Sequence, residues 1–251
     1  MEAFTKLRTF NIGMAVLHAL QGVAVVLLSR DFSLPISSSF LKFNTTTQSL
    51  APATTELFSL SLPLLVAGFF FLSAIFHLFI ATSYRQTYEA NLAKGMNKAR
   101  WFEYSISASV MMVAISLLVG IYDLSSLLMI FGLTACMNLM GLVMEVHNQT
   151  TKVTDWLSYW IGCILGALPW VVVALYLWTG SANGSSAPTF VYWIFVSIFI
   201  FFNTFAINMW LQYKKVGKWK DYLYGERTYM ILSLVAKSLL AWQVFAGTLR
   251  P

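Results

Sequence analysis

The sequence predicts an all-α membrane protein, built as a bundle of seven transmembrane helices. Hydrophobic residues make up 58% of the 251-residue chain and charged residues only 10%, whereas a soluble domain carries about 25% charged residues. The mean hydropathy of +0.70 agrees, and seven apolar stretches approach the length of about 20 residues that a helix needs to cross a bilayer. This composition excludes a secreted domain, a disordered chain and a nucleic-acid-binding protein.

The seven apolar stretches are predicted to be helices rather than strands. They cover residues 10–28, 57–82, 101–122, 124–146, 156–178, 190–212 and 229–249. They are too long for spanning strands and lack the alternation of a barrel, and a continuous apolar segment in lipid satisfies its own backbone only as a helix. We find no internal repeat, and we predict one seven-helix membrane domain over residues 1–251.

The first span follows Lys6 and Arg8, a pattern that a signal peptide shares. The span is long enough to cross the membrane and no small-x-small cleavage site closes it, so we predict a retained helix. The connection after it, residues 29–56, is the only long one. It is rich in Ser and Thr and is predicted to hold a short surface hairpin.

The later spans carry features that interrupt or join them. Pro63 interrupts the start of the second span, Tyr122-Asp123 joins the third and fourth spans as a tight hairpin, and Pro169 requires a supported kink in the fifth. One face of the fourth span carries small or polar residues at i, i+4, i+7 and i+11, namely Thr134, Asn138, Gly141 and Glu145. Glu145 lies near the end of this span and is predicted to be hydrated.

Lys and Arg in the connections predict the orientation of the chain. Twelve lie on the side of the N-terminus: Lys6, Arg8, Arg85, Lys94, Lys98, Arg100, Lys152, Lys214, Lys215, Lys218, Lys220 and Arg227. Three lie on the other side: Arg30, Lys42 and Arg250. We therefore predict a multi-pass protein of the cell membrane with a cytoplasmic N-terminus and an extracellular C-terminus.

Two charged side chains fall well within the predicted spans, where a charge costs several kcal/mol and usually marks function. Lys237 lies about eight residues into the seventh span, roughly 12 Å deep. Glu103 begins the third span on the same side, so the two side chains can meet. Three interpretations of Lys237 are open: an amine that snorkels to the interface, a structural ion pair with Glu103, and a lysine that forms a Schiff base with an aldehyde. The depth argues against snorkelling.

The neighbours of this pair are also polar. Ser233 lies one turn before Lys237 on the same helix face, where its hydroxyl can bond the lysine nitrogen without adding charge. Glu103 is then the only carboxylate that we expect to balance a protonated Schiff base, with Ser107 one turn after it. Arg100 has two equal interpretations, as an interfacial anchor and as a group that tunes Glu103.

Two histidines also lie in the spans, toward the N-terminal side. His18 shares a helix face with Asn11, and His77 shares one with Ser73. Either histidine alone is often a hydrogen-bond partner between helices. At the level of Glu103, the two together predict a polar cavity that can hold a proton. His147 is predicted to be a solvated residue at the end of a span.

The remaining residues limit the kinds of site that the protein can contain. The sixth span is dense in phenylalanine, which indicates lipid-facing or core packing, or the wall of an apolar slot. Cys136 and Cys163 lie within apolar runs and predict neither a disulfide framework nor a metal site. The sequence offers no nucleophile–base pair, phosphate loop or metal-ligand cluster, so we do not expect an enzyme.

Two segments resemble the heliorhodopsin family: ARWFEYSISAS in the third span and SLVAKS in the seventh. The predicted inside N-terminus and the long first outside loop fit the same family, and the resemblance covers the full chain. It implies that Lys237 binds all-trans retinal as a Schiff base, with Glu103 as counterion and Ser233 where pumping rhodopsins carry a second aspartate. The other residues that it implicates are His18, His77 and Arg100 in a proton-accepting cavity, and Met137, Asn138, Gly141 and Phe202 near the chromophore.

The resemblance implies a dimeric, light-sensing protein with a slow photocycle and no ion pumping. The residues of the spans also favour a protein that does not pump ions. A pump needs proton donors and acceptors on both sides of the chromophore, but the residue eleven positions after Glu103 is Ala114, which offers no carboxylate. The alternatives are a light-gated channel or transporter, and a light-dependent regulator of a soluble partner. The basic loop YKKVGKWKDYLYGER, residues 213–227, would dock that partner, unless its charge serves topology alone.

Overall fold

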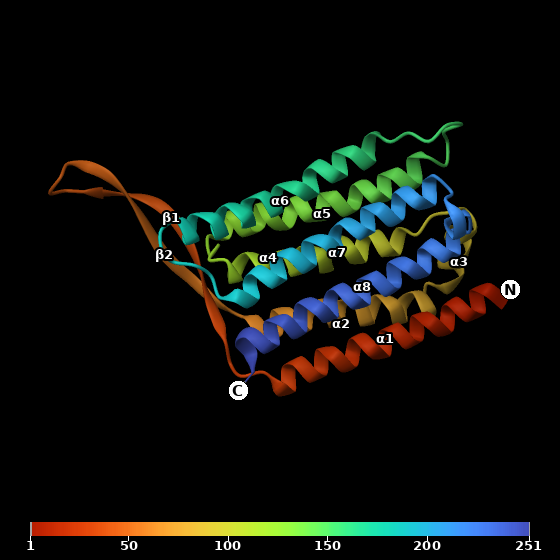
Figure 1. Ribbon diagram of the computed structural model, residues 1–251, viewed down its shortest axis with the longest axis horizontal. Coiled ribbons are helices and arrows are strands. Elements are labelled where there is room, and N and C mark those ends of the chain that lie inside the picture. Colours follow the sequence, from red (N-terminus) through yellow and green to blue (C-terminus); the bar gives the residue numbers. More distant parts are fainter. Residues whose placement is uncertain (1, 251) are drawn as a thin grey trace.

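The computed structural model describes residues 2–250, in which long helices run side by side and a β-hairpin extends from one end (Figure 1). The elements are α1 (Glu2–Leu28), β1 (Ser33–Asn44), β2 (Ser49–Ser61), α2 (Leu62–Ala81), α3 (Arg85–Ala93), α4 (Lys98–Leu118), α5 (Leu124–His147), α6 (Leu157–Ala182), α7 (Thr189–Tyr213), the 3₁₀ turn η1 (Gly217–Lys220), α8 (Tyr222–Val244) and the π turn η2 (Phe245–Leu249). Among the described residues, seven helices are long and apolar enough to cross a membrane. The predicted seven-helix membrane fold is confirmed.

Two of the spanning helices begin seven or more residues before their apolar stretches. α1 begins at Glu2, where the Glu2 carboxylate pairs with Lys6 one turn later at 2.6 Å. α8 begins at Tyr222 rather than at residue 229, because Asp221 caps it by accepting a hydrogen bond from the backbone N–H of Leu223 at 3.0 Å. Residues 222–228, a polar segment that hydropathy placed outside the seventh span, therefore belong to α8.

The hairpin β1–β2 is longer than the short hairpin predicted for this loop. Its antiparallel strands have 12 and 13 residues, with one irregularity after Ile36. Most of its side chains are exposed on both faces, so no apolar alternation marks its length in the sequence. The hairpin is tied to the bundle where the backbone N–H of Ser37 bonds the Tyr122 carbonyl at 2.9 Å.

Asp123 joins the hairpin to the start of α5. Its carboxylate accepts hydrogen bonds from the backbone N–H groups of Ser39 and Ser126, each at 3.1 Å. The hydroxyl of Ser125, followed by the backbone N–H of Ser126, lowers the pKa of Asp123 to about 2. The carboxylate therefore stays ionised at neutral pH and caps α5 in that state.

The interior of the bundle is divided between its two ends. Toward the hairpin, α2, α4, α7 and α8 share a large apolar cluster that includes Phe69, Ile115, Ile194 and Leu240. Toward the N-terminus two smaller apolar clusters enclose most of the buried charged and amide side chains: Asn11, Asn97, Arg100, Glu103, Glu145, Asn208 and Glu226. The candidate site lies where these two parts of the interior meet.

Candidate functional site

Lys237 on α8 and Glu103 on α4 form a buried ion pair. Lys237 is 3% exposed, and its Nζ lies 3.3 Å from Oε1 of Glu103. Nζ also donates a hydrogen bond to Oγ of Ser233 at 2.7 Å, and Glu103 Oε1 accepts one from the hydroxyl of Ser73 on α2 at 2.6 Å. Snorkelling is excluded because the amine ends inside the bundle. The structure thus brings Lys237 and Glu103 together as the sequence predicted, with Ser233 beside the amine.

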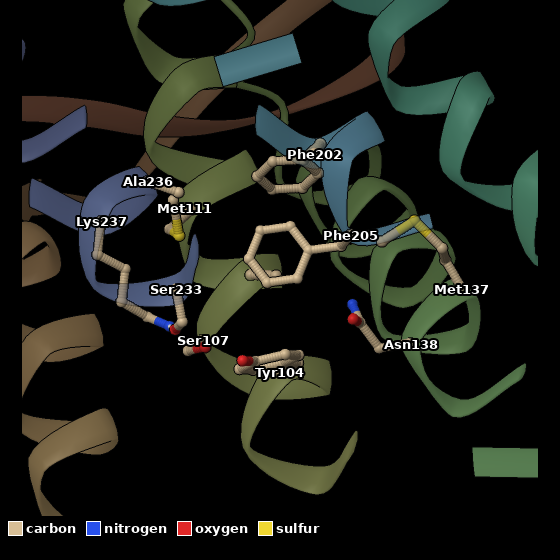
Figure 2. A pocket seen from close by; sticks show the side chains of 11 residues that line it. Tyr104, Ser107, Met111, Met137, Asn138, Phe202, Phe205, Ser233, Ala236 and Lys237 are labelled. Atoms are coloured by element: carbon tan, nitrogen blue, oxygen red, sulfur yellow. The ribbon is translucent and has the colours of Figure 1, made fainter. Parts of the chain in front are cut away.

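An apolar cavity begins at the Lys237 amine. Its lining includes the aromatic rings of Tyr104, Phe202 and Phe205, together with Met137 and Asn138. Figure 2 shows Lys237, Ser233 and Ser107 on one side of these rings and Met137 and Asn138 on the other. Three of the predicted chromophore neighbours, Met137, Asn138 and Phe202, thus face the same space as the lysine.

A second cavity continues the first toward α6. The two enclose about 50 Å³ and about 90 Å³ and share Met137, Asn138, Phe202 and Phe205 in their walls. The second also reaches Gly162 and Cys163. Met137 and Phe205 thus stand in the walls of both cavities, and methionine is a flexible side chain that adapts to irregular gaps.

Gly141 lies in the wall of the second cavity, and the side chain nearest to it is that of Trp101. A Cβ at position 141 would collide with the indole ring of Trp101. The glycine therefore lets the Trp101 side chain pass close to α5, beside the predicted chromophore region.

The two spanning histidines lie next to each other, with ring centroids 5.4 Å apart. Nδ1 of His77 bonds Oδ1 of Asn11 at 2.8 Å, and Nδ1 of His18 bonds the Met14 carbonyl at 2.8 Å. Within residues 2–250, the buried Nε2 of His18 meets no hydrogen-bond partner.

A small polar cavity adjoins His77. It measures about 20 Å³, and its lining includes His77, Asn11, Glu103, Arg100 and Glu226. That volume holds about one water molecule. His77 and Arg100 thus share the wall of this cavity with Glu103, and His18 lies next to His77 outside the lining; that these groups accept a proton stays a prediction.

Arg100 is the centre of a second buried charge cluster. Its guanidinium pairs with Glu145 of α5 and with Glu226 of α8, and it lies 4.0 Å from the ring centroid of Tyr229. Arg100 is 5% exposed, so the interpretation as an interfacial anchor is wrong. The prediction that Glu145 is hydrated is also wrong, because Glu145 is 2% exposed.

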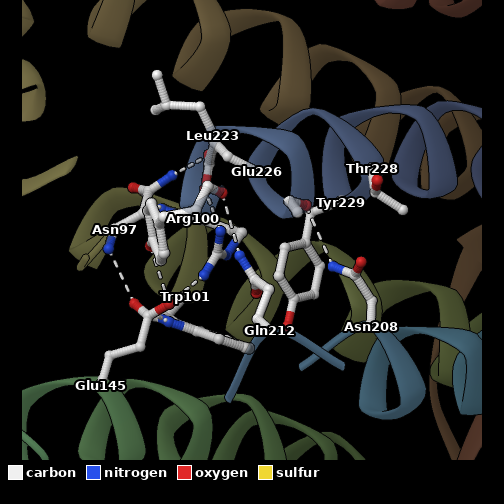
Figure 3. Close-up of polar contacts among 12 residues, drawn as sticks. Asn97, Arg100, Trp101, Glu145, Asn208, Gln212, Leu223, Glu226, Thr228 and Tyr229 are labelled. Carbon is white, nitrogen blue, oxygen red and sulfur yellow. Dashed lines mark hydrogen bonds and ion pairs between the residues drawn. The ribbon is translucent and has the colours of Figure 1, made fainter. Parts of the chain in front are cut away.

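Further donors surround the two carboxylates of this cluster (Figure 3). Oε2 of Glu145 accepts from Trp101 Nε1 at 2.7 Å, and Oε1 accepts from the Tyr222 hydroxyl at 3.0 Å. Asn97 donates its backbone N–H to Glu145 and its side-chain amide to Glu226. We call Arg100, Glu145 and Glu226 the arginine triad.

Glu226 was missed because it precedes the apolar stretch of the seventh span. A periodicity signal was available, since Glu226, Ser233 and Lys237 stand at i, i+7 and i+11 and so share one helix face. Lys237 and Glu103 are thus not the only buried charges among the described residues, because Arg100, Glu145 and Glu226 are buried as well. His147, in contrast, is exposed as predicted and bonds Asp155 at 3.2 Å.

The chain has seven membrane helices, and the lysine buried in the last of them pairs with a carboxylate on α4. This combination defines the class of rhodopsin-like proteins. A sequence model of the heliorhodopsin family matches residues 7–249, and the chain belongs to that family. A search of curated proteins gave no match.

Membership implies a retinal chromophore and a light-sensing role. The site fits such a group, because the Lys237 amine opens on apolar, aromatic walls with the hydroxyl of Ser107 beside it.

Proposed function

We propose that the chain is a light-sensing photoreceptor in which Lys237 binds all-trans retinal as a protonated Schiff base and Glu103 is the counterion. The observation that carries this proposal is the 3.3 Å pair of Lys237 Nζ and Glu103 Oε1 at the end of an aromatic cavity. Retinal, when bound, supplies an aldehyde for the linkage and a polyene that light isomerises. We propose a receptor rather than an enzyme.

The residues around Lys237 hold its nitrogen in one position and favour its charged form. Glu103 supplies the negative charge, and the Ser73 hydroxyl bonds the same carboxylate oxygen. Ser233 accepts a hydrogen bond from the nitrogen without adding a second charge. Tyr104, whose ring centroid lies 5.3 Å from Nζ, supplies an aromatic face toward the cation.

The surroundings of the pair support a proton that leaves and returns on one side. Glu103, His77, Arg100 and Glu226 border the polar cavity toward the N-terminal end. On the hairpin side, Ala114 and Leu240 are buried in the apolar cluster. We therefore propose that the proton moves toward Glu103 and the histidines, and that the photocycle is slow and pumps no ions.

The orientation and the partners complete the proposal. The twelve basic residues of the N-terminal side favour a cytoplasmic N-terminus and an extracellular hairpin and C-terminus. We propose a homodimer in the cell membrane, formed by the whole chain as one retinal-binding domain. A soluble protein on the cytoplasmic side is the proposed receiver of the signal.

The decisive variant is Lys237→Ala. With all-trans retinal added, membranes that contain this variant should show no visible pigment, because no other buried amine faces the cavity among the described residues. Lys98→Ala, which removes an exposed lysine at the start of α4, should give the pigment of the unmodified protein. Circular dichroism confirms that both variants are folded. A visible band of normal intensity in folded Lys237→Ala would refute the assignment.

A further inference from the structure

A large cavity opens at the N-terminal end of the bundle, outside the site described above. It measures about 430 Å³, within the range of small-molecule pockets. Four lysines from three separate connections line it: Lys94 after α3, Lys152 between α5 and α6, and Lys215 and Lys220 between α7 and α8. We call it the lysine pocket.

The lysine pocket contains no acidic side chain in its lining. Within residues 2–250, none of its four lysines takes part in an ion pair. The nearby carboxylates have other partners: Asp221 caps α8, Asp155 bonds His147, and Glu145 pairs with Arg100. Four unneutralised charges thus converge on one concave space.

Topology alone does not explain this arrangement. A positive N-terminal side requires lysines in its loops, but not their convergence on one cavity. Two other lysines of the same loop lie against aromatic rings instead: Lys214 Nζ is 5.4 Å from the Trp156 centroid and Lys218 Nζ is 6.0 Å from that of Tyr224. The loop therefore separates lysines that face the pocket from lysines that do not.

The walls of the pocket are held in place by hydrogen bonds. Trp219 donates Nε1 to Oδ1 of Asn208 at 2.6 Å, and the Gln212 amide bonds the Tyr222 carbonyl at 3.2 Å. Asn148 bonds both the carbonyl and the N–H of Asp155, which closes the α5–α6 connection. A pocket fixed in this way loses little freedom when it binds a ligand.

We propose that the lysine pocket binds a multiply charged phosphate group. Several lysines around a cavity without carboxylates favour a compact polyanion, and lysine serves phosphate as a strong point charge. The amides of Gln149 and Gln212 each donate one N–H to a backbone carbonyl and keep a second N–H as a further donor in the lining. The phosphate belongs either to a soluble polyphosphate compound or to the headgroup of a phosphorylated lipid. The inference is independent of retinal binding.

The test uses the full chain in nanodiscs and two double variants of equal charge. Lys215→Gln/Lys220→Gln removes two lysines that line the pocket, and Lys214→Gln/Lys218→Gln removes two that lie outside it. Calorimetry in phosphatidylcholine discs measures binding of inorganic pyrophosphate. We expect the first variant to weaken binding by about tenfold or more, because it loses charge-assisted contacts. The second should change it by about twofold or less, through long-range charge only.

A second arm distinguishes the two sources of phosphate. Cardiolipin replaces part of the phosphatidylcholine, and native mass spectrometry measures the cardiolipin that each variant retains. A soluble source predicts pyrophosphate binding that cardiolipin leaves unchanged. A lipid source predicts retention of cardiolipin that requires Lys215 and Lys220 and reduces pyrophosphate binding. The proposal is overturned if neither probe binds, or if the two double variants lose binding equally.

Discussion

The two buried charge clusters differ in how fully their charged groups are surrounded by hydrogen-bond partners. Lys237 faces one carboxylate and one hydroxyl, and its amine borders a cavity. Arg100 faces two carboxylates, and these accept further hydrogen bonds from Asn97, Trp101 and Tyr222. The first cluster keeps space beside its cation, whereas the second surrounds its carboxylates with donors.

The difference separates a site for chemistry from a structural connection. A lysine beside an apolar cavity can form a covalent bond with a ligand that fills the cavity. A guanidinium held by two carboxylates joins α4, α5 and α8 at the N-terminal end, and such a network fixes geometry when its groups are satisfied. The same contrast predicts that changes in the two clusters will have different effects, on colour and on stability.

The largest expected loss of stability follows from Arg100→Gln. The change leaves Glu145 and Glu226 buried without their cation, and removing one partner of a buried ion pair costs about 3–5 kcal/mol. Denaturant or thermal unfolding in nanodiscs should show a large loss, and the triple change with Glu145→Gln and Glu226→Gln should recover much of it. Unchanged stability in Arg100→Gln would mean that the arginine triad does not hold the helices together.

The largest expected change in colour follows from Glu103→Gln. Opposite charges about 4 Å apart interact by about 4 kcal/mol at an effective dielectric constant near 20. Without this anion the protonated Schiff base is less favoured, so the midpoint of the spectral pH titration should fall by up to about three pH units. Where the pigment stays protonated, its visible maximum should move to longer wavelength.

Glu145→Gln is the matched control for that experiment. It also removes one buried carboxylate, but from the arginine triad rather than from the Lys237 pair. We expect it to lower the free energy of unfolding while the spectral titration stays close to that of the unmodified protein. If Glu145→Gln moves the titration and Glu103→Gln does not, the counterion is misassigned.

A smaller shift is expected from Ser233→Ala. The hydroxyl accepts a hydrogen bond from the Lys237 nitrogen at 2.7 Å, and a hydrogen bond to a charged group contributes about 1.5 kcal/mol or more. Its loss should lower the spectral titration midpoint by about one pH unit. Ser238→Ala removes a hydroxyl of the same helix that bonds the Leu234 carbonyl instead, and it should leave the midpoint unchanged. Equal shifts would show that the effect does not come through Lys237.

Much of the fold was predictable because a bilayer requires long apolar helices. The seven spans and the meeting of Lys237 with Glu103 follow from hydropathy and depth alone. The extra helix α3 was not predicted, since its nine residues are too few to span a bilayer and bury only Tyr88 and Leu92. The full length of the hairpin was not predicted either, because its exposed strands show no apolar alternation.

The arginine triad was not predictable from hydropathy, because its three residues lie near the ends of the apolar stretches. There a charge is expected to reach water, as we assumed for Glu145. In the structure α8 starts early, and Asn97, Trp101 and Tyr222 replace water around the carboxylates. Such a network of ion pairs and hydrogen bonds depends on side chains from three helices, which no single stretch of sequence reveals.

Locating the covalent linkage decides whether retinal is bound to Lys237. Borohydride reduction of the pigment should fix the retinyl group on its nitrogen, and peptide mass spectrometry then identifies the modified residue. We predict one retinyl group on the peptide that contains Lys237, and none on peptides that contain the lysines of the connections. A retinyl group found on another lysine, or a coloured protein with unmodified Lys237, would contradict the account.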